Sequence, residues 1–259
     1  MGSAVGPACF IVTASDLQPL HPENVMAKYA DDCYLIVASK NSHTITSELD
    51  QVFQWGNSNN LKLNRKKTQE LIVSKKGQKL SPPPILQDIN RVTSLVVLGI
   101  TISDKLSFRE HATNVLARGN QNLYALKILK ANGLVGASLN NVCKSTFFAS
   151  LFYASPAWWG FLTEEDKSRF NSLIHKAQKW QLDGGCTLPN FASVCEKADS
   201  ELFKNILQNS NHVLHQLLPP VKDTQYNLRP RAHNRTLPRC LSEFYKHNFI
   251  PRMIFKDSY

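Results

Sequence analysis

The chain carries the sequence Val25-Met26-Ala27-Lys28-Tyr29-Ala30-Asp31-Asp32-Cys33-Tyr34-Leu35-Ile36-Val37. Strand-forming residues lie on both sides of a short polar break, so the stretch predicts a β-hairpin with Asp31 and Asp32 at its tip. The break lacks the Asn-Gly or Asp-Gly pair that is most typical of hairpin turns. Together with helical patterns further along the chain, this stretch predicts an α+β fold with antiparallel strands.

Two adjacent carboxylates at a rigid turn favour the binding of a hard divalent cation such as Mg²⁺, which prefers oxygen ligands. Such a pair suits two-metal phosphoryl transfer, in which paired ions stabilise the attacking and the leaving oxygens. The dipeptide alone has a second interpretation, because aspartates are common in turns, where they bond their own backbone. The sequence around Asp31 and Asp32 must decide between the two.

That sequence resembles the reverse transcriptase domain of non-LTR (LINE-type) retrotransposons, whose motifs are matched in order over most of the chain. Motif B is matched by Gly2-Ser3-Ala4-Val5-Gly6-Pro7 with Asp16-Leu17, and motif C by Lys28-Tyr29-Ala30-Asp31-Asp32-Cys33. Motif D is matched by Trp55 together with Asn60-Leu61-Lys62-Leu63-Asn64 and Lys66-Lys67-Thr68, and motif E by Val97-Leu98-Gly99-Ile100-Thr101-Ile102. The closing segment of CR1, L2 or Jockey-like elements is matched by Asn227-Leu228-Arg229-Pro230-Arg231 and Arg252-Met253-Ile254-Phe255. The order of the motifs carries the resemblance more than any one match.

The resemblance implies a fragment of an RNA-directed DNA polymerase that works by two-metal nucleotidyl transfer. The implied cofactor is Mg²⁺ or Mn²⁺, and the catalytic and metal-binding residues would be Asp31 and Asp32. The residues implied to contact template, nucleotide or primer end are Gly2, Gly6, Pro7, Tyr29, Lys66 and Lys67. Those of the primer grip are Leu98 and Gly99. The implied partners are an RNA template, a DNA primer and deoxynucleoside triphosphates.

In that family a third catalytic aspartate lies in motif A, which with the fingers region precedes motif B, and this sequence starts at motif B. Asp16 is the only acidic residue before Glu23, and nothing downstream resembles a replacement. Octahedral Mg²⁺ tolerates the loss of a ligand poorly. We therefore expect the chain alone to have little or no polymerase activity. Two alternatives stay open: a non-catalytic nucleic-acid-binding remnant of a retrotransposon, and a product without a stable fold, because absent neighbouring elements would leave an open sheet edge.

The composition is that of a folded, basic protein. Its 259 residues are 42% hydrophobic, and 30 Lys and Arg against 20 Asp and Glu give a formal net charge of +10. This excess favours a polyanionic partner, here nucleic acid rather than a membrane. The six cysteines lack the Cys-x-x-Cys spacing of zinc or redox sites. Residues 8–14 are apolar but too short to cross a bilayer, and no signal peptide is evident, so we expect a cytoplasmic or nuclear location.

Residues 1–103 are expected to form part of a polymerase palm. A helix is predicted over 42–57, with Ser42 as its N-cap and one apolar face formed by Ile45, Leu49, Val52 and Phe53. The other elements expected here are a strand over 68–74, a turn over the lysine- and proline-rich residues 75–84, and a pair of strands over 92–102.

Residues 104–218 are expected to form a helical thumb and post-thumb region. An amphipathic helix is predicted after Phe108, ending at Asn132-Gly133, with a buried stripe formed by Leu116, Leu123, Leu126, Ile128 and Leu129. Two more helices are predicted over 139–154 and 164–181. The aromatic residues of 152–160 have two interpretations, a platform for stacking bases or a junction in the core.

Residues 219–259 are expected to be a basic, proline-containing segment with a short helix over 241–248. Its basic residues are Arg229, Arg231, His233, Arg235, Arg239, Lys246, His247, Arg252 and Lys256. The segment has two interpretations, a solvated tail or an arm that contacts phosphates.

Overall fold

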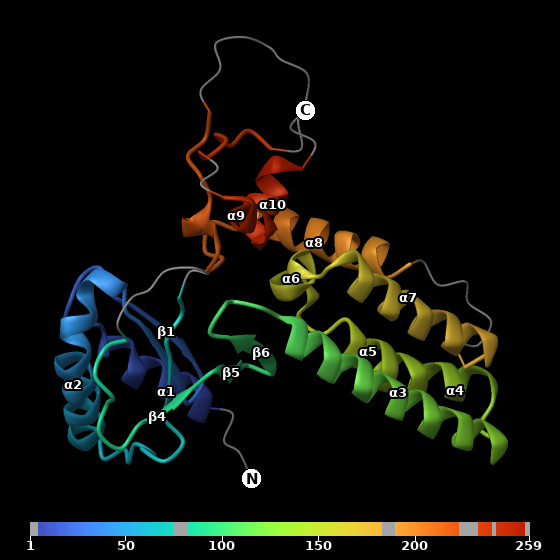
Figure 1. Cartoon of the computed structure of the whole chain (residues 1–259), viewed down its shortest axis with the longest axis horizontal. Coiled ribbons are helices and arrows are strands. Elements are labelled where there is room, and N and C mark those ends of the chain that lie inside the picture. Colours follow the sequence, from blue (N-terminus) through green and yellow to red (C-terminus); the bar gives the residue numbers. More distant parts are fainter. Residues whose placement is uncertain (1–4, 75–81, 183–189, 223–232, 240–241, 257–259) are drawn as a thin grey trace. The chain divides into compact units, whose positions relative to one another are not determined.

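The computed structural model describes residues 5–74, 82–182, 190–222, 233–239 and 242–256. The chain divides into two compact units, Met1–Leu95 and Val96–Tyr259 (Figure 1). The first unit mixes helices with short strands, and the second is mainly helical, so the predicted mixture of helix and strand is confirmed. The finer division into segments 1–103, 104–218 and 219–259 stays a prediction.

The predicted hairpin is confirmed. Strands β1 (Val25–Tyr29) and β2 (Asp32–Ile36) are antiparallel, and their register places Tyr29 opposite Asp32. Only Ala30 and Asp31 connect them, and Ala30 has a positive φ of 48°, which is the usual way for so short a connection to follow the twist of the strands. Asp31 therefore lies in the turn, and Asp32 is the first residue of β2.

A short apolar helix, α1 (Gly6–Thr13), and the 3₁₀ turn η1 (Ala14–Asp16) precede the hairpin. Ala14 and Leu17 are buried, whereas Ile11 and Val12 on α1 are largely exposed. The buried residues of this segment thus lie after the C-terminal end of α1, on the side that leads toward β1.

Helix α2 (Ile45–Ser58) confirms the helix predicted after the hairpin, and its predicted apolar residues are half-buried. The predicted cap is wrong. The 3₁₀ turn η2 (Ser39–Thr44) runs directly into α2, and Ser42 uses its backbone oxygen to accept the N–H of Ile45. Thr44 stands at the cap position without a side-chain bond to the helix.

Strands β3 (Gln69–Leu71) and β4 (Asn90–Val92) form a parallel pair. A strand within 68–74 is confirmed, but the parallel pairing departs from the antiparallel sheet that was predicted. The connection between these strands is long enough for the chain to cross back, which parallel pairing requires. Residues 75–81 of the predicted turn lie outside the described residues, and Pro82, Pro83 and Pro84 belong to no helix or strand.

Strands β5 (Ser94–Val97) and β6 (Ile100–Ser103) pair with each other, which confirms the predicted strand pair. Their two-residue connection is Leu98-Gly99, with φ of 47° and 84°. Positive φ at both positions is the requirement of the turn that most often closes a tight hairpin.

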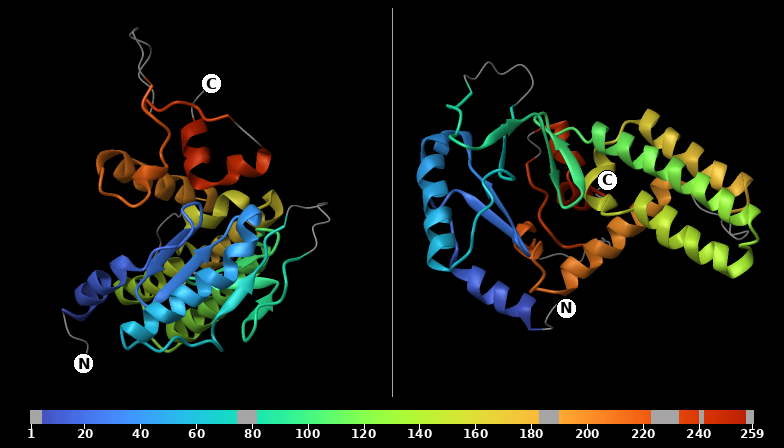
Figure 2. Two further views of the ribbon diagram at one scale, coloured as in Figure 1. Left: turned by 90° about the vertical axis from the view of Figure 1, so that its left-hand side faces the viewer. Right: turned by 90° about the horizontal axis from the view of Figure 1, so that it is seen from below.

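The second unit is built from helices, which Figure 2 shows from two further sides. They are α3 (Arg109–Ala131), α4 (Gly136–Val142), the π-helical turn η3 (Cys143–Phe148), α5 (Ala149–Leu151), α6 (Ser155–Trp158), η4 (Trp159–Phe161), α7 (Glu164–Lys179), α8 (Phe191–Gln208), η5 (His215–Leu217), α9 (Glu243–His247) and α10 (Phe249–Phe255). The helices predicted after Phe108 and near 139–154, 164–181 and 241–248 are confirmed, whereas α8 and α10 were not predicted. Among the residues described, no helix is long and apolar enough to cross a membrane.

The predicted end of α3 is confirmed, and its predicted stripe is partly wrong. Gly133 has φ of 94°, and the N–H of Leu134 bonds the oxygen of Leu129, as in a Schellman cap. Leu116, Leu123 and Leu126 are buried, but Ile128 is 45% exposed and Leu129 40% exposed. Ile128 follows Leu126 by two residues, a rotation of about 200° that places it on the opposite face.

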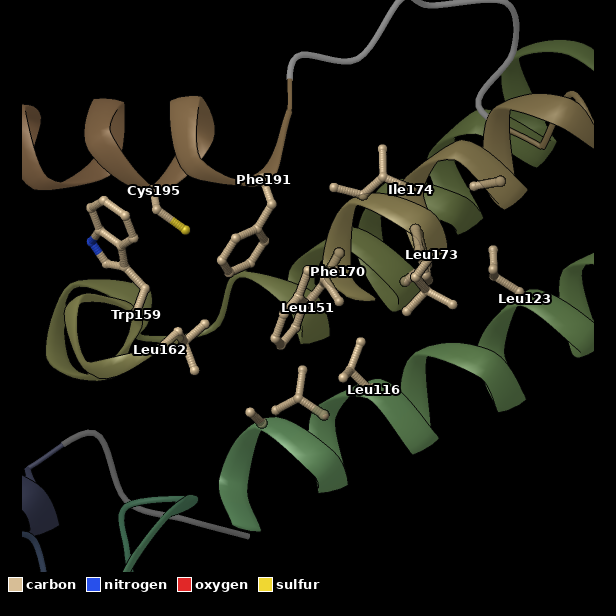
Figure 3. Packing of buried hydrophobic residues seen from close by; sticks show 14 of the residues in the cluster. Leu116, Leu123, Leu151, Trp159, Leu162, Phe170, Leu173, Ile174, Phe191 and Cys195 are labelled. Atoms are coloured by element: carbon tan, nitrogen blue, oxygen red, sulfur yellow. The ribbon is translucent and has the colours of Figure 1, made fainter. Parts of the chain in front are cut away.

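The core of the second unit lies between α3, α5, α7 and α8. Figure 3 shows Leu116 of α3 facing Phe170 of α7, with Phe191 of α8 beyond. Trp158 is fully buried and Trp159 is 6% exposed, so the core interpretation of the aromatic stretch is confirmed for both tryptophans. Their burial leaves them unable to stack on bases.

The end of the chain is tied to α8. Arg252 of α10 forms an ion pair with the buried carboxylate of Asp199, with Nε and Nη2 at 3.0 and 3.1 Å from its two oxygens. Trp159 donates its indole N–H to the same carboxylate at 2.8 Å. Arg252 therefore belongs neither to a solvated tail nor to a phosphate-contacting arm, because its charge is used inside the fold.

Candidate metal and nucleic-acid site

The β1–β2 hairpin presents both aspartates to solvent. Asp31 lies in the turn and Asp32 pairs with Tyr29, and all three residues are exposed. Strand alternation places Tyr29 on the same face as Asp32. The structure thus brings together three of the residues predicted for the site.

The described surroundings of the two carboxylates hold no cation that is paired with either of them. Neither Asp31 nor Asp32 forms an ion pair with any residue that the structure describes. Tyr34 donates a long hydrogen bond of 3.4 Å to Asp32 Oδ2. Burial raises the pKa of the neighbouring Cys33 thiol, and the negative charges of both aspartates raise it further, while Lys28 opposes them. A pair of exposed, uncompensated carboxylate groups is a donor set that fits Mg²⁺ or Mn²⁺.

Lys28 holds the hairpin against the segment that follows α1. Its Nζ donates hydrogen bonds to the carbonyl oxygens of Ala14 at 2.6 Å and Leu17 at 2.7 Å. Both oxygens belong to the turn that ends the helix, so one half-buried ammonium joins β1 to η1. The sequence analysis placed Lys28 in motif C but missed this role, because its acceptors are backbone atoms and leave no mark in the sequence.

Glu48 of α2 holds the loop that leads into β1. Its fully buried carboxylate accepts the backbone N–H groups of Leu20 at 2.8 Å and His21 at 2.9 Å, and the side-chain amide of Asn24 at 2.8 Å. Burial by itself would raise the pKa of Glu48, but these hydrogen bonds outweigh it and hold the pKa below its ordinary value. Glu48 is thus a charged residue that fixes a loop, and it was not predicted from the sequence.

Asn24 and Asn41 extend this polar cluster. Both are 4% exposed, and Asn41 donates to Asn24 Oδ1 at 3.2 Å, while Asn24 Nδ2 also donates to Thr44 Oγ1 at 3.0 Å. Buried polar groups that satisfy one another in this way specify a single arrangement of the chain. The loop between η1 and β1 is therefore fixed at its start by Lys28 and in its middle by the Glu48 cluster.

The other predicted site residues are spread over both units. Gly2 lies outside the described residues. Gly6 begins α1, Pro7 lies in its first turn, and Lys66 and Lys67 are exposed in the turn before β3. None of these residues is shown to contact Asp31 or Asp32.

Leu98 and Gly99 form the β5–β6 turn, beside Tyr153. The hydroxyl of Tyr153 donates to the carbonyl oxygen of Leu98 at 3.2 Å. A side chain at Gly99 would bring its Cβ to 3.4 Å from the ring of Tyr153, on top of the strain of its positive φ. The turn closes a cavity of about 270 Å³, whose lining includes His111 and Arg118 of α3. Burial and the charge of Arg118 lower the pKa of His111.

The described residues offer no third acidic partner for the hairpin. Within the described ranges, no group of three His, Cys, Asp or Glu side chains is placed to hold a metal ion. Asp16, the acidic residue of the stretch matched to motif B, instead accepts the indole N–H of Trp55 at 2.8 Å. The hairpin therefore supplies two carboxylates and no more.

Comparison with known proteins gives a family match for the part of the chain that carries the hairpin. Residues 1–102 match the family model of the reverse transcriptase, described as an RNA-dependent DNA polymerase. These residues are similar to a segment of a reverse transcriptase domain, and we call them the reverse transcriptase segment. The reverse transcriptase segment contains α1, the Asp31-Asp32 hairpin, α2 and all of the strands up to most of β6.

A curated relative supports the non-LTR retrotransposon type. The RNA-directed DNA polymerase from mobile element jockey of Drosophila melanogaster is 29% identical over 173 residues, which are 59% of this chain and 18% of that protein. The chain thus spans less than a fifth of the relative's length. That alignment is longer than the reverse transcriptase segment matched by the family model, so it includes residues beyond 1–102. No solved structure matches the chain.

Proposed function

We propose that the chain is part of an RNA-directed DNA polymerase of a non-LTR retrotransposon, with Asp31 and Asp32 as metal ligands. The observation that carries this proposal is the tight hairpin, which holds two exposed, uncompensated carboxylates within a reverse transcriptase segment. The substrates would be an RNA template, a DNA primer and deoxynucleoside triphosphates.

The two units supply a rationale for a palm and a thumb. The first unit and the β5–β6 hairpin would form part of the palm, and the helices from α3 onward would form the thumb and the region after it. The order of elements supports this assignment, because a hairpin, a helix and short strands precede a long helix. Leu98 and Gly99 would then contact the primer, with Tyr153 holding their turn.

Divalent ions bound by Asp31 and Asp32 would offset the negative charge that develops on the transferred phosphoryl group and on the leaving oxygen. The residues of the chain would position this centre. Lys28 and Glu48 fix the loop on which the hairpin rests, and Tyr29 lies on the face of Asp32, where a primer end would pack. Lys66 and Lys67 would contact phosphates of the nucleotide or primer.

The described residues place only two carboxylates at the hairpin, so we expect at most slight primer extension by the chain alone. The test measures extension of a DNA primer on an RNA template with Mg²⁺ or Mn²⁺, for the chain and for Asp31→Asn. The rate of any extension should fall by about 10²-fold or more in the variant. Removing one group that stabilises charge in a transition state has an effect of this size. Extension that persists in Asp31→Asn would contradict the proposed role.

A second measurement does not depend on the chemical step. Retention of a deoxynucleoside triphosphate on the complex of chain, template and chain-terminated primer should require Mg²⁺ and should weaken at least about 10-fold in Asp31→Asn. The matched control is Asp50→Asn, which removes an exposed carboxylate from α2. Equal retention by the chain and both variants would favour a non-catalytic nucleic-acid-binding protein.

A further inference from the structure

Basic side chains gather where two parallel helices of the second unit end. A Cβ added to Gly119 of α3 would lie 2.6 Å from Leu173 Cδ2 of α7, and further along Lys130 of α3 bonds the backbone oxygen of Trp180, the residue after α7. The two helices therefore run in the same direction, side by side (Figures 1 and 2). Their shared C-terminal end carries the lysine cluster, which we define as Lys127, Lys130, Lys176 and Lys179.

Among the residues that the structure describes, acidic side chains are absent from this end of both helices. The acidic residues of α3 and α7 lie in their first turns, and the sequence contains no Asp or Glu between Glu110 and Glu164. No member of the lysine cluster forms an ion pair with a residue in the described part of the chain. The charges are thus sorted along the helices, with positive charge at the shared end.

Three of the four lysines contact groups that leave their charge in place. The ring of Trp180 lies within reach of Lys127 Nζ at 5.1 Å and of Lys176 Nζ at 4.9 Å from its centroid. Lys130 Nζ donates to the backbone oxygens of Trp180 at 2.8 Å and Gln181 at 3.4 Å. An aromatic face or a carbonyl oxygen attracts an ammonium without neutralising it, and each ammonium carries three donors. Further donors remain for an anion.

Compensation of the helix dipoles explains only part of this charge. Each helix C-terminus carries the equivalent of roughly −0.5 elementary charge, so two parallel ends together supply about −1. The lysine cluster supplies four positive charges. An excess of about three positive charges therefore remains without a neutralising partner among the described residues.

We propose that the lysine cluster binds the phosphate backbone of a nucleic-acid strand. A row of phosphates matches several mobile ammonium groups that have no fixed acidic partner, and such contacts carry no base specificity. The choice of nucleic acid as the polyanion rests on the proposed polymerase function, but the surface is separate from the predicted site residues and contains none of them.

The test measures the affinity of the full chain for a fluorescently labelled single-stranded RNA by anisotropy at several salt concentrations, without divalent ions. The cluster variant combines Lys127→Gln, Lys176→Gln and Lys179→Gln and keeps Lys130, whose bonds to the backbone that directly follows α7 support the fold. Each neutralised phosphate contributes about 0.7 to the slope of log affinity against log salt for single strands, so the slope should fall by about 2. The affinity should fall at least about 10-fold at low salt.

The matched control removes the same charge from exposed lysines elsewhere in the second unit and combines Lys105→Gln, Lys197→Gln and Lys204→Gln. It should leave the salt slope nearly unchanged, and both variants should keep the thermal midpoint of the parent chain. Equal losses in the two variants would overturn the proposal, because net charge alone would then explain binding. An unchanged RNA affinity in the cluster variant would also overturn the proposal. If the same variant lost binding to vesicles that contain phosphatidylserine, the cluster would bind an anionic membrane surface instead of nucleic acid.

This outcome is separable from that of the polymerase proposal. Asp50→Asn should leave RNA binding without divalent ions unchanged, because Asp50 belongs neither to the cluster nor to the proposed polymerase site. Loss of RNA binding only in the cluster variant would therefore support the surface even if nucleotide retention failed to depend on Asp31.

Discussion

Lys28 and Glu48 are charged side chains whose partners are mainly backbone atoms of one loop. Lys28 donates to the oxygens of Ala14 and Leu17, and Glu48 accepts the N–H groups of Leu20 and His21. Charge-assisted bonds of this kind are stronger than neutral ones. At the scale of single residues, these two side chains decide where the Asp31-Asp32 hairpin lies within the first unit.

Glu48→Gln should destabilise the first unit by about 1–3 kcal/mol, because an amide N–H₂ would face a backbone donor that has lost its acceptor. The folded-state pKa of Glu48 lies below its unfolded value, so the stabilisation is complete above the unfolded value and is lost as the pH falls through the folded one. Denaturant unfolding between about pH 6 and pH 3 should show less acid destabilisation in Glu48→Gln than in Asp50→Asn. The same acid dependence in both variants would contradict the assignment.

Lys28→Met should loosen the hairpin from η1 by leaving the oxygens of Ala14 and Leu17 without their donor. We expect a loss of about 1–3 kcal/mol in stability and a weaker affinity of the hairpin for Mn²⁺. Lys28→Arg keeps a charge and donors and should recover part of both. If Lys28→Met weakened stability but left Mn²⁺ affinity unchanged, Lys28 would have no positioning role.

The helices and strands themselves were predicted well from patterns of side chains in the sequence. The contacts that cap a helix or decide which strands pair were not. The hairpin follows from strand-forming residues around Ala30-Asp31, and the end of α3 follows from Gly133. Ser42 failed as a cap because a 3₁₀ turn joins α2 directly, which depends on backbone geometry. The parallel pairing of β3 with β4 depends on contacts between distant residues, which the local pattern does not contain.

The pairing of α3 with α7 depends on a glycine. A side chain at Gly119 would meet Leu173, which is 4% exposed and has little room to move. Gly119→Val should therefore destabilise the second unit by about 1–3 kcal/mol through overpacking. Gln121→Val, at an exposed position of the same helix, is the control for the introduced branched residue. Thermal unfolding that is equally affected by both changes would show that α3 and α7 do not require the close approach.

At the scale of the whole molecule, both hydrophobic clusters found among the described residues lie in the second unit. The buried cluster of the second unit runs from Ile100 to Cys195, and a smaller one joins Phe203 to Met253 and Ile254. The basic C-terminal residues were predicted as a tail or an arm. Both interpretations were wrong for Arg252. Its partner is the buried carboxylate of Asp199 on α8, a helix that was not predicted, and the density of basic residues in a sequence does not reveal such a partner.

Arg252→Met should destabilise the second unit strongly, by about 3–5 kcal/mol, because it leaves the carboxylate of Asp199 buried without its ion pair. Near-ultraviolet circular dichroism of the buried tryptophans should show that the variant unfolds at a lower denaturant concentration than the parent chain. Arg109→Met, which removes an exposed arginine from α3, should have little effect. Comparable stability of the two variants would mean that the ion pair contributes nothing to holding the chain end.

Binding of Mn²⁺ to the full chain, followed by electron paramagnetic resonance of the free ion, tests the central claim most directly. We predict saturable binding that is lost when Asp31→Asn and Asp32→Asn are combined and that is kept in Asp50→Asn. Such a result would assign the metal site of the reverse transcriptase segment to the hairpin. Binding that is unchanged in the double variant, or absent from the parent chain, would contradict the claim.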